Sequence, residues 1–204
     1  MLSRNELVDH LATGITPAED RALGCEYEAL VVSRESGQTI PFDGGCGISA
    51  LLEALSEGGS WKPKYEGKHA IALTRNGQSI TLEPGGQFEM SGAPFKQLSE
   101  VSNELQRHLS ELQELSHIFP VDFEWKGLNP YQTIEQVHWM PKKRYRIMRS
   151  YLPSKGDLSL YMMGLTCTVQ ANLDITSADD FAFKLRLATG IGPLVTALFA
   201  NSPI

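Results

Sequence analysis

The spacing of apolar residues along the chain predicts three helices in its first 120 residues. Ser3 and Glu6 have the spacing of a capping box and precede a short apolar stripe, so a short helix is expected near the amino end. Apolar residues within 48–55 recur every three or four positions and predict a second helix. A longer stripe over 95–115 predicts a long amphipathic helix with Pro94 near its first turn.

Other segments have the composition or the two-residue alternation of strands. Residues 23–32 are rich in β-formers, and residues 121–125 alternate apolar with charged side chains. Residues 71–82 form a hairpin pattern around the Asn-Gly pair at 76–77, because Asn-Gly readily adopts the positive φ angles of a tight turn. Residues 158–175 read as one long β-like segment. These segments predict a sheet that contains at least one hairpin.

The carboxy-terminal part returns to helical patterns. Ser177 and Asp180 have cap spacing before a helix expected from Phe181 to about Ala188, and a second helical piece is expected after Pro193. Taken together, the elements predict an α+β fold with an antiparallel or mixed sheet and helices on one face. We expect a single domain over 1–204, with the other face of the sheet left polar.

Composition narrows the class of protein. The 204 residues are 42% hydrophobic, with 18 Gly and 11 Pro scattered along the chain, which fits a globular domain and excludes collagen-like and wholly disordered chains. The net charge of -6 argues against nucleic acid or an anionic membrane as the main partner. We find no uninterrupted apolar run of about 20 residues and no signal-peptide pattern, so a cytoplasmic protein without a membrane span is expected.

Four glutamates lie on predicted strands or on the turns beside them. Glu26 and Glu28 are two residues apart, so their carboxylates point to the same face of a strand. Glu83 and Glu89 flank a proline and two glycines that interrupt a strand and bring Glu83, Gln87 and Glu89 close together. Carboxylates gathered on one face repel one another without a cation, and Mg²⁺ prefers oxygen ligands. A magnesium site is one interpretation, and ordinary solvated strand residues are the other.

A basic cluster opens the helix expected after Pro141. Its five cations are Lys142, Lys143, Arg144, Arg146 and Arg149. On a helix, Lys142, Arg146 and Arg149 share one side and Arg144 points elsewhere. Phosphoryl transfer needs cations that spread the charge of the transferring group, and arginine binds phosphate or carboxylate oxygens in a bidentate manner. A solvated basic helix face explains the pattern equally well.

Polar residues alternate on a later strand, where Thr168, Gln170 and Asn172 share one face. Their oxygen and amide groups suit a metal, a ribose or a substrate carboxylate, and solvent exposure explains them equally well. The chain has no P-loop motif and no histidine pair at zinc spacing.

The chain resembles glutamate–cysteine ligases of the plant and proteobacterial type from Glu26 onward. Four blocks carry the resemblance in the same order, LEPGGQFEMSGAP at 82–94, MPKKRYRIMRSYLP at 140–153, TCTVQANLD at 166–174 and TALFANSP at 196–203. The resemblance implies part of a glutamine-synthetase-like catalytic domain, in which a curved antiparallel sheet forms a funnel for ATP, Mg²⁺ and the amino acids. By its length the chain resembles the amino-terminal half of such an enzyme.

The resemblance also implies roles for individual residues. The implied metal ligands are Glu26, Glu28, Glu83, Glu89 and Gln170. The implied contacts to nucleotide or substrate are Gln87, Lys143, Thr168 and Asn172. Arg144 and Arg149 are the implied catalytic contacts to phosphate or carboxylate. The chain departs from the plant pattern at Gly164 and Leu165, where an arginine is common, and at Arg146, where an acid is common.

The activity implied is ATP-dependent joining of the γ-carboxylate of L-glutamate to L-cysteine through a γ-glutamyl phosphate, the first step of glutathione biosynthesis. No nucleic acid or membrane is expected as a partner, whereas a carboxy-terminal half or a homo-oligomer is compatible with the resemblance. The alternatives are a truncated or split non-catalytic fragment, a related carboxylate–amine ligase with another amine acceptor, and a regulator that binds phosphate or a nucleotide.

Overall fold

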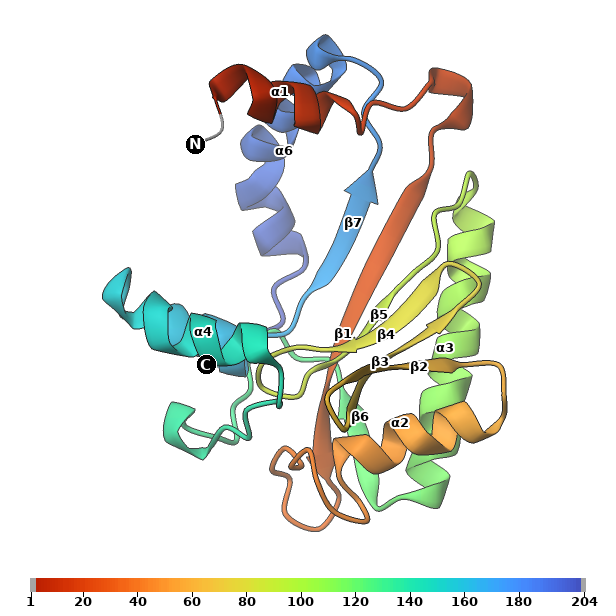
Figure 1. Ribbon diagram of the computed structural model, residues 1–204, viewed down its shortest axis with the longest axis vertical. Helices are drawn as coiled ribbons and strands as arrows, with labels where there is room; N and C mark the ends of the chain where they lie inside the picture. The colour runs from red at the N-terminus through yellow and green to blue at the C-terminus, as the bar shows by residue number, and fades with distance from the viewer. Residues whose placement is uncertain (1–2, 203–204) are drawn as a thin grey trace.

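A computed structural model describes residues 3–202 and shows an open antiparallel sheet with helices around it (Figure 1). The sheet order is β2-β3-β4-β5-β1-β6, and β7 also pairs with β1. The strands are β1 (Leu23–Ser33), β2 (Lys62–Glu66), β3 (His69–Arg75), β4 (Gln78–Leu82), β5 (Phe88–Ser91), β6 (Val121–Glu124) and β7 (Val169–Leu173). Every pairing is antiparallel. The α+β class is therefore confirmed.

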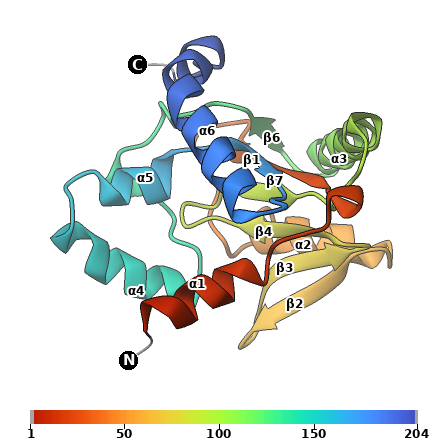
Figure 2. The ribbon, with the colours of Figure 1, turned by 90° about the horizontal axis from the view of Figure 1, so that it is seen from above.

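The helices divide between the two sides of β1. They are α1 (Arg4–Ala12), α2 (Ile48–Glu57), α3 (Leu98–Ile118), α4 (Lys143–Tyr151), α5 (Ser159–Leu165) and α6 (Ala178–Leu198). Figure 2 shows α3 on one side of β1 and α4 and α5 on the other. The prediction of helices on one face thus holds for α2 and α3 and not for α4 and α5, although Tyr145 of α4 also joins the core.

The core lies between α2, α3 and the inner face of the sheet. Fully buried residues from the sheet, such as Leu73, Ile80 and Phe88, pack in one cluster with Leu51 of α2 and Leu112 of α3. Burying apolar side chains of this size contributes about 1.5–3 kcal/mol each. This packing covers one face of the sheet. The face that carries the glutamates holds polar groups and a smaller buried cluster of Leu30, Val32 and Cys167, so the prediction of a polar face holds only in part.

Short-range signals were correctly read at two places. Ser3 and Glu6 form the predicted capping box of α1, with hydrogen bonds at 3.2 and 2.7 Å. The hairpin of β3 and β4 turns at Asn76 and Gly77, whose φ angles of 46° and 84° match the predicted turn. Both signals depend only on neighbouring residues, which explains why the sequence alone sufficed.

Three predicted boundaries are wrong. The segment 158–175 is a strand only over Val169–Leu173, because residues 159–165 form the helix α5. The last helix does not stop near Ala188, since α6 runs unbroken from Ala178 to Leu198 with Pro193 inside it. The long helix α3 starts at Leu98, with Gln97 as its cap, so Pro94 lies outside it. The strand β2, which the pattern did not predict, adds an edge to the sheet.

Among the described residues, α6 has the length and apolar composition of a membrane-spanning helix, and none of it is buried. The prediction that the chain has no uninterrupted apolar run of about 20 residues still holds, because Lys184 and Arg186 interrupt α6, but the mean composition of α6 meets the requirement that this prediction did not consider. Apolar helices of soluble proteins meet the same criterion, so it assigns no membrane to the chain. Pro203, the last residue of the fourth sequence block, lies outside the described residues.

Candidate active site on the acidic face

Strand register brings the predicted polar residues into two rows that cross four strands. In one row, Glu28 of β1 lies opposite Glu89 of β5, which lies opposite Thr81 of β4. In the other row, Glu26 lies opposite Ser91, and on its other side it lies opposite Gln170 of β7. Because paired residues share a face of a sheet, all of these side chains lie on the face opposite to Tyr27. We call this surface, together with Glu83, the acidic face.

Glu28 is held by Thr168, which immediately precedes β7. The Thr168 backbone N–H and hydroxyl donate to the two carboxylate oxygens at 3.0 and 2.9 Å. Only 9% of Glu28 is exposed, and burial raises the pKa of its carboxyl group. The two Thr168 bonds lower that pKa, while the charges of Glu89 and Glu26 raise it again. Glu28 is therefore a buried acid whose ionised form depends on its partners.

The other β-strand acids also have protein donors. The Thr81 hydroxyl donates to Glu89 Oε2 at 2.6 Å, and the Ser91 hydroxyl donates to Oε1 at 3.0 Å. Asn172 donates to Glu26 Oε1 at 2.8 Å. The predicted residues Thr168 and Asn172 thus meet the predicted acids directly, whereas Gln170 donates to the Thr168 hydroxyl at 3.1 Å.

The acidic face has the donor chemistry of a hard-cation site but not its final geometry. Burial raises the pKa of Glu83, and the charges of Glu89 and Glu28 raise it further, so the carboxylates are close enough to repel one another. Nevertheless, among residues 3–202 no group of three or more acidic, histidine or cysteine side chains is arranged to hold a metal ion. In the described structure, Glu26, Glu28 and Glu89 instead accept hydrogen bonds from amide and hydroxyl donors of the protein. Carboxylate oxygens are ligands of the type that Mg²⁺ prefers, so the chemistry of these side chains fits this cation.

Glu83 lies at the end of β4 beside the first turn of α4. The Tyr145 hydroxyl lies 2.5 Å from the Leu82 carbonyl oxygen and 3.2 Å from Glu83 Oε1. Lys142 Nζ donates to the same Leu82 carbonyl at 2.8 Å and to the Tyr145 hydroxyl at 3.3 Å. Burial lowers the pKa of Lys142, while the charges of Glu83 and Glu89 raise it. This contact joins the acidic face to the basic helix.

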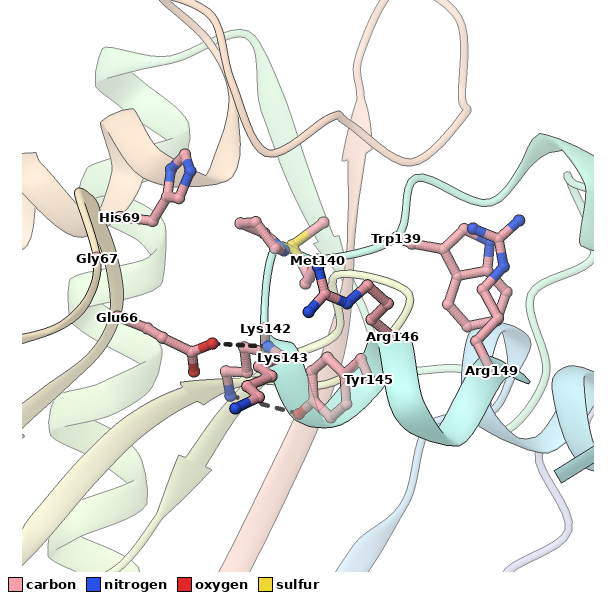
Figure 3. A pocket seen from close by; sticks show the side chains of 11 residues that line it. Glu66, Gly67, His69, Trp139, Met140, Lys142, Lys143, Tyr145, Arg146 and Arg149 are labelled. Atoms are coloured by element: carbon pink, nitrogen blue, oxygen red, sulfur yellow. Dashed lines mark hydrogen bonds between the residues drawn. The ribbon is translucent and has the colours of Figure 1, made fainter. Parts of the chain in front are cut away.

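The structure separates the two predicted catalytic arginines. A cavity of about 530 Å³ lies between α4 and the turn that joins β2 to β3, and we call it the α4 pocket (Figure 3). Lys142, Lys143, Arg146 and Arg149 line it, but Arg144 does not, which confirms the predicted division of the helix. None of the four acids of the acidic face lines this pocket. Arg149 lies over the Trp139 ring, with its guanidinium carbon 4.6 Å from the ring centroid.

Gln87, predicted to contact substrate, is 2% exposed and bonds to the protein interior. Its Oε1 accepts from the Gly85 N–H at 2.9 Å, and its Nε2 donates to the carbonyl oxygens of Thr166 at 2.7 Å and Met163 at 3.3 Å. These bonds fix the glycine turn against the segment that leads to β7. In the described structure Gln87 bonds only to backbone groups of the protein and holds the glycine turn in place. Its contact with substrate stays a prediction.

Sequence reasoning missed Thr81, Ser91 and Tyr145 as partners of the acids. A signal for both hydroxyl residues was present. Ser91 follows Glu89 by two residues on the same strand, and Thr81 lies opposite Glu89 on the paired strand. Finding them required the register of β4 and β5, which the pattern alone did not give. Tyr145 had a weaker signal, since only the contact between α4 and the end of β4 brings it to Glu83.

Comparison with known proteins identifies the family of the chain. Residues 22–204 match the family model described as glutamate-cysteine ligase family 2. The chain is 39% identical over 202 residues to the chloroplastic glutamate–cysteine ligase of Brassica juncea and 38% identical to ligase A of Oryza sativa subsp. japonica. It is 39% identical to the Arabidopsis thaliana enzyme.

These matches cover 99% of the chain but only 38–40% of each relative. The chain therefore spans about two fifths of the length of the curated relatives that it matches. Because the family model covers nearly all of the chain, the family is established for this sequence. The chain belongs to glutamate-cysteine ligase family 2.

Proposed function

We propose that the chain is the part of an ATP-dependent glutamate–cysteine ligase that carries an acidic magnesium-binding sheet face. The observation behind the proposal is the pair of rows in which Glu26, Glu28 and Glu89 meet across β1 and β5, in a chain of this family. We further propose a partial glutamine-synthetase-like fold, which is supported by the open, antiparallel sheet with one acidic face.

The proposed reaction has two steps. The γ-carboxylate of glutamate attacks the γ-phosphorus of ATP and releases ADP, which gives a γ-glutamyl phosphate. The amine of cysteine then attacks the acyl carbon, phosphate leaves, and the amine loses a proton as the γ-amide forms. Bound Mg²⁺ supplies charge stabilisation for phosphoryl transfer.

The residues of this chain have defined parts in that reaction. Glu26, Glu28, Glu83 and Glu89 are the proposed metal-binding carboxylates, with Gln170 as a fifth oxygen donor. Thr168 positions Glu28 through two hydrogen bonds, and Asn172 positions Glu26. Arg144 and the α4-pocket cations Lys143 and Arg149 offset negative charge on ATP or on substrate carboxylates.

Mutation of Glu28 tests the proposal. ADP release is measured with Mg²⁺, ATP, glutamate and cysteine in the intact protein, and Glu28→Gln is expected to lower kcat/KM by at least a hundredfold. The matched control is Glu114→Gln, which makes the same change on the exposed surface of α3 and should stay within twofold of the unmutated protein. Full activity of Glu28→Gln would refute the assignment of the acidic face.

A second candidate is a binding module without its own turnover, which is favoured by the acids of the acidic face. They bond to protein donors, and among residues 3–202 no three acids are arranged to hold a metal ion. Calorimetry separates the two readings. Binding of Mg²⁺-ATP and glutamate without ADP release favours the module, whereas release of ADP that depends on cysteine favours the ligase. The acceptor amine and the compartment stay predictions, with cysteine and the cytoplasm expected. The relatives from Brassica juncea and Oryza sativa are named as chloroplastic enzymes.

A further inference from the structure

The α4 pocket carries positive charge that the protein offsets only in part, because the charges of Glu83 and Glu89 act on Lys142 alone among the cations whose pKa is shifted. Four cations line it, Lys142, Lys143, Arg146 and Arg149, against one carboxylate, Glu66. Among residues 3–202, none of these four side chains forms an ion pair with an acid. In a chain with a net charge of -6, a basic group of this size without an ion pair is a local exception. Its charge is therefore available to an anionic ligand.

The single carboxylate is already engaged. Glu66 Oε1 accepts the backbone N–H of Lys143 at 2.7 Å, at the first turn of α4, as Figure 3 shows. Because this bond uses a backbone donor, Glu66 leaves the side-chain donors of Lys143, Arg146 and Arg149 to a ligand. By contrast, Lys142 already donates to the Leu82 carbonyl and the Tyr145 hydroxyl. The bond also ties the turn between β2 and β3 to the helix, which fixes the two walls of the pocket.

The pocket has the size and the fixed side chains of a ligand site. Its volume of about 530 Å³ lies within the range of roughly 300–1,000 Å³ that is usual for small-molecule sites. Arg149 lies over the Trp139 ring, and the partly buried Lys142 is bonded to the Leu82 carbonyl, so two of the four cations have defined positions. Defined cations lose less side-chain entropy when an anion binds.

Phosphate groups match this arrangement better than a single carboxylate does. Arg146 and Arg149 lie on one side of α4 and present planar forks that bind two oxygens each. Two arginines and two lysines supply donors to several oxygens at once. A single carboxylate has too few oxygens to accept from all of them. A diphosphate carries several negative charges on adjacent groups and fits such a set.

We propose that the α4 pocket is an anion site for a diphosphate-bearing ligand, lined by residues other than the four glutamates of the acidic face and joined to that face through Tyr145 and Lys142. Arg146 and Arg149 are its main ligands and Lys142 and Lys143 complete it. Arg146 belongs to the basic cluster of the sequence, and the pocket adds it to the individual residues, Lys143 and Arg149, to which the resemblance gives a role.

Calorimetry with pyrophosphate in EDTA tests the site. Without a divalent cation the acidic face repels pyrophosphate, so binding reports the α4 pocket alone. The intact protein is expected to bind pyrophosphate, and Arg146→Gln and Arg149→Gln are each expected to weaken Kd at least tenfold. Lys155→Gln makes the same loss of charge just beyond α4, outside the pocket, and should stay within twofold.

Two results would overturn the proposal. The first is absence of pyrophosphate binding, or equal binding by Arg146→Gln and the unmutated protein when circular dichroism shows both folded. The second is binding of glutarate, a dicarboxylate, as tight as that of pyrophosphate, which would assign the pocket to carboxylates. Arg146→Lys keeps the charge and is expected to recover part of the affinity.

A competition experiment identifies the source of the diphosphate. If ATP displaces pyrophosphate with the same dependence on Arg146, the site holds the phosphate chain of the co-substrate. If ATP does not displace it, the site takes a separate phosphorylated ligand. Both results support the pocket, and only the first interpretation rests on the proposed ligase function, which the assay of ADP release tests independently.

Discussion

Thr168 donates two hydrogen bonds to the carboxylate of Glu28, from residues that are 140 positions apart in the chain. The bonds tie β7 to β1 and give two donors to an acid that is only 9% exposed. They also link two segments that the sequence analysis singled out, the polar face that begins at Thr168 and the strand that carries Glu26 and Glu28. The geometry of the acidic face therefore depends on a contact between two segments that are far apart in the chain.

Loss of the Thr168 hydroxyl should destabilise the protein at alkaline pH. Thr168→Val keeps the shape but leaves one Glu28 oxygen without a donor, which is expected to lower the free energy of unfolding by about 1–2 kcal/mol. The folded-state pKa of Glu28 is raised by burial, so the protonated form contributes stability below pH 4.5 that is lost as pH rises through the raised pKa. Without the Thr168 hydroxyl the pKa of Glu28 rises further, so Thr168→Val should lose more unfolding free energy than the unmutated protein as the pH rises above 4.5.

Urea unfolding in EDTA at pH 4 and pH 8 measures this difference. Thr168→Ser retains the hydroxyl and serves as the control. An equal loss of stability for both variants at both pH values would show that the contact with Glu28 is not responsible.

Removal of one carboxylate should reveal the metal site. Glu89 raises the pKa of both Glu28 and Glu83 through its charge, so Glu89→Gln is expected to remove repulsion and leave the metal-free protein equally stable or up to about 1 kcal/mol more stable at pH 8. Mg²⁺ should raise the melting temperature of the unmutated protein and have little effect on the variant. A melting temperature of the unmutated protein that is independent of Mg²⁺ would contradict the site. Glu114→Gln is the control.

His108 should make the protein sensitive to acid. It is fully buried on α3, neither ring nitrogen has a hydrogen-bond partner among the described residues, and burial first and Arg75 second lower its pKa to about 4. Because the unfolded chain binds the proton near pH 6.5, stability is complete above that pH and falls as pH decreases toward 4. The expected loss between pH 7.5 and pH 5 is about 2 kcal/mol from this residue alone.

Unfolding of His108→Met over that pH range checks the prediction, since the variant should lose this part of the pH dependence. His138→Gln removes an exposed histidine and should leave the dependence unchanged. If His108→Met keeps the whole acid sensitivity, another group is responsible.

The glycine turn before β5 should not tolerate a side chain. A Cβ at Gly85 would lie 2.2 Å from the Gly164 carbonyl oxygen, a backbone atom that cannot move without shifting α5. Gly85→Ala is expected to lower stability by at least about 2 kcal/mol, because backbone shifts at such contacts are costly. Gly156→Ala, where a Cβ meets nothing within 4 Å, should be neutral by thermal unfolding. Equal melting temperatures for both variants would show that the contact yields without cost.

The sequence by itself gave good access to local structure. The capping box of α1 and the Asn76–Gly77 turn depend on residues within a few positions, and both are present as predicted. The alternation of β1 also put Glu26 and Glu28 on one face, as strand geometry requires. The apolar periodicity predicted the fold class, because the helical and strand periods were separate along most of the chain.

Periodicity failed where local signals were mixed. Apolar and polar residues in 158–165 fit a strand as well as a helix, and only packing against the Gln87 turn selected α5. The sequence pattern predicts that the last helix is interrupted at Pro193, yet α6 continues through this residue. A single proline removes one hydrogen bond, and a helix with enough remaining bonds can retain it.

Residue types and local periods were determined by the sequence, including the acids, the arginines and the division of α4 into two sides. Only the tertiary structure decided which of them meet. Register placed Glu28 opposite Glu89, the return of β7 gave Glu28 its donors, and the docking of α4 beside the β2–β3 turn drew Arg149 into a pocket without Arg144. Such pairings depend on contacts between segments far apart in the chain, which no local pattern encodes.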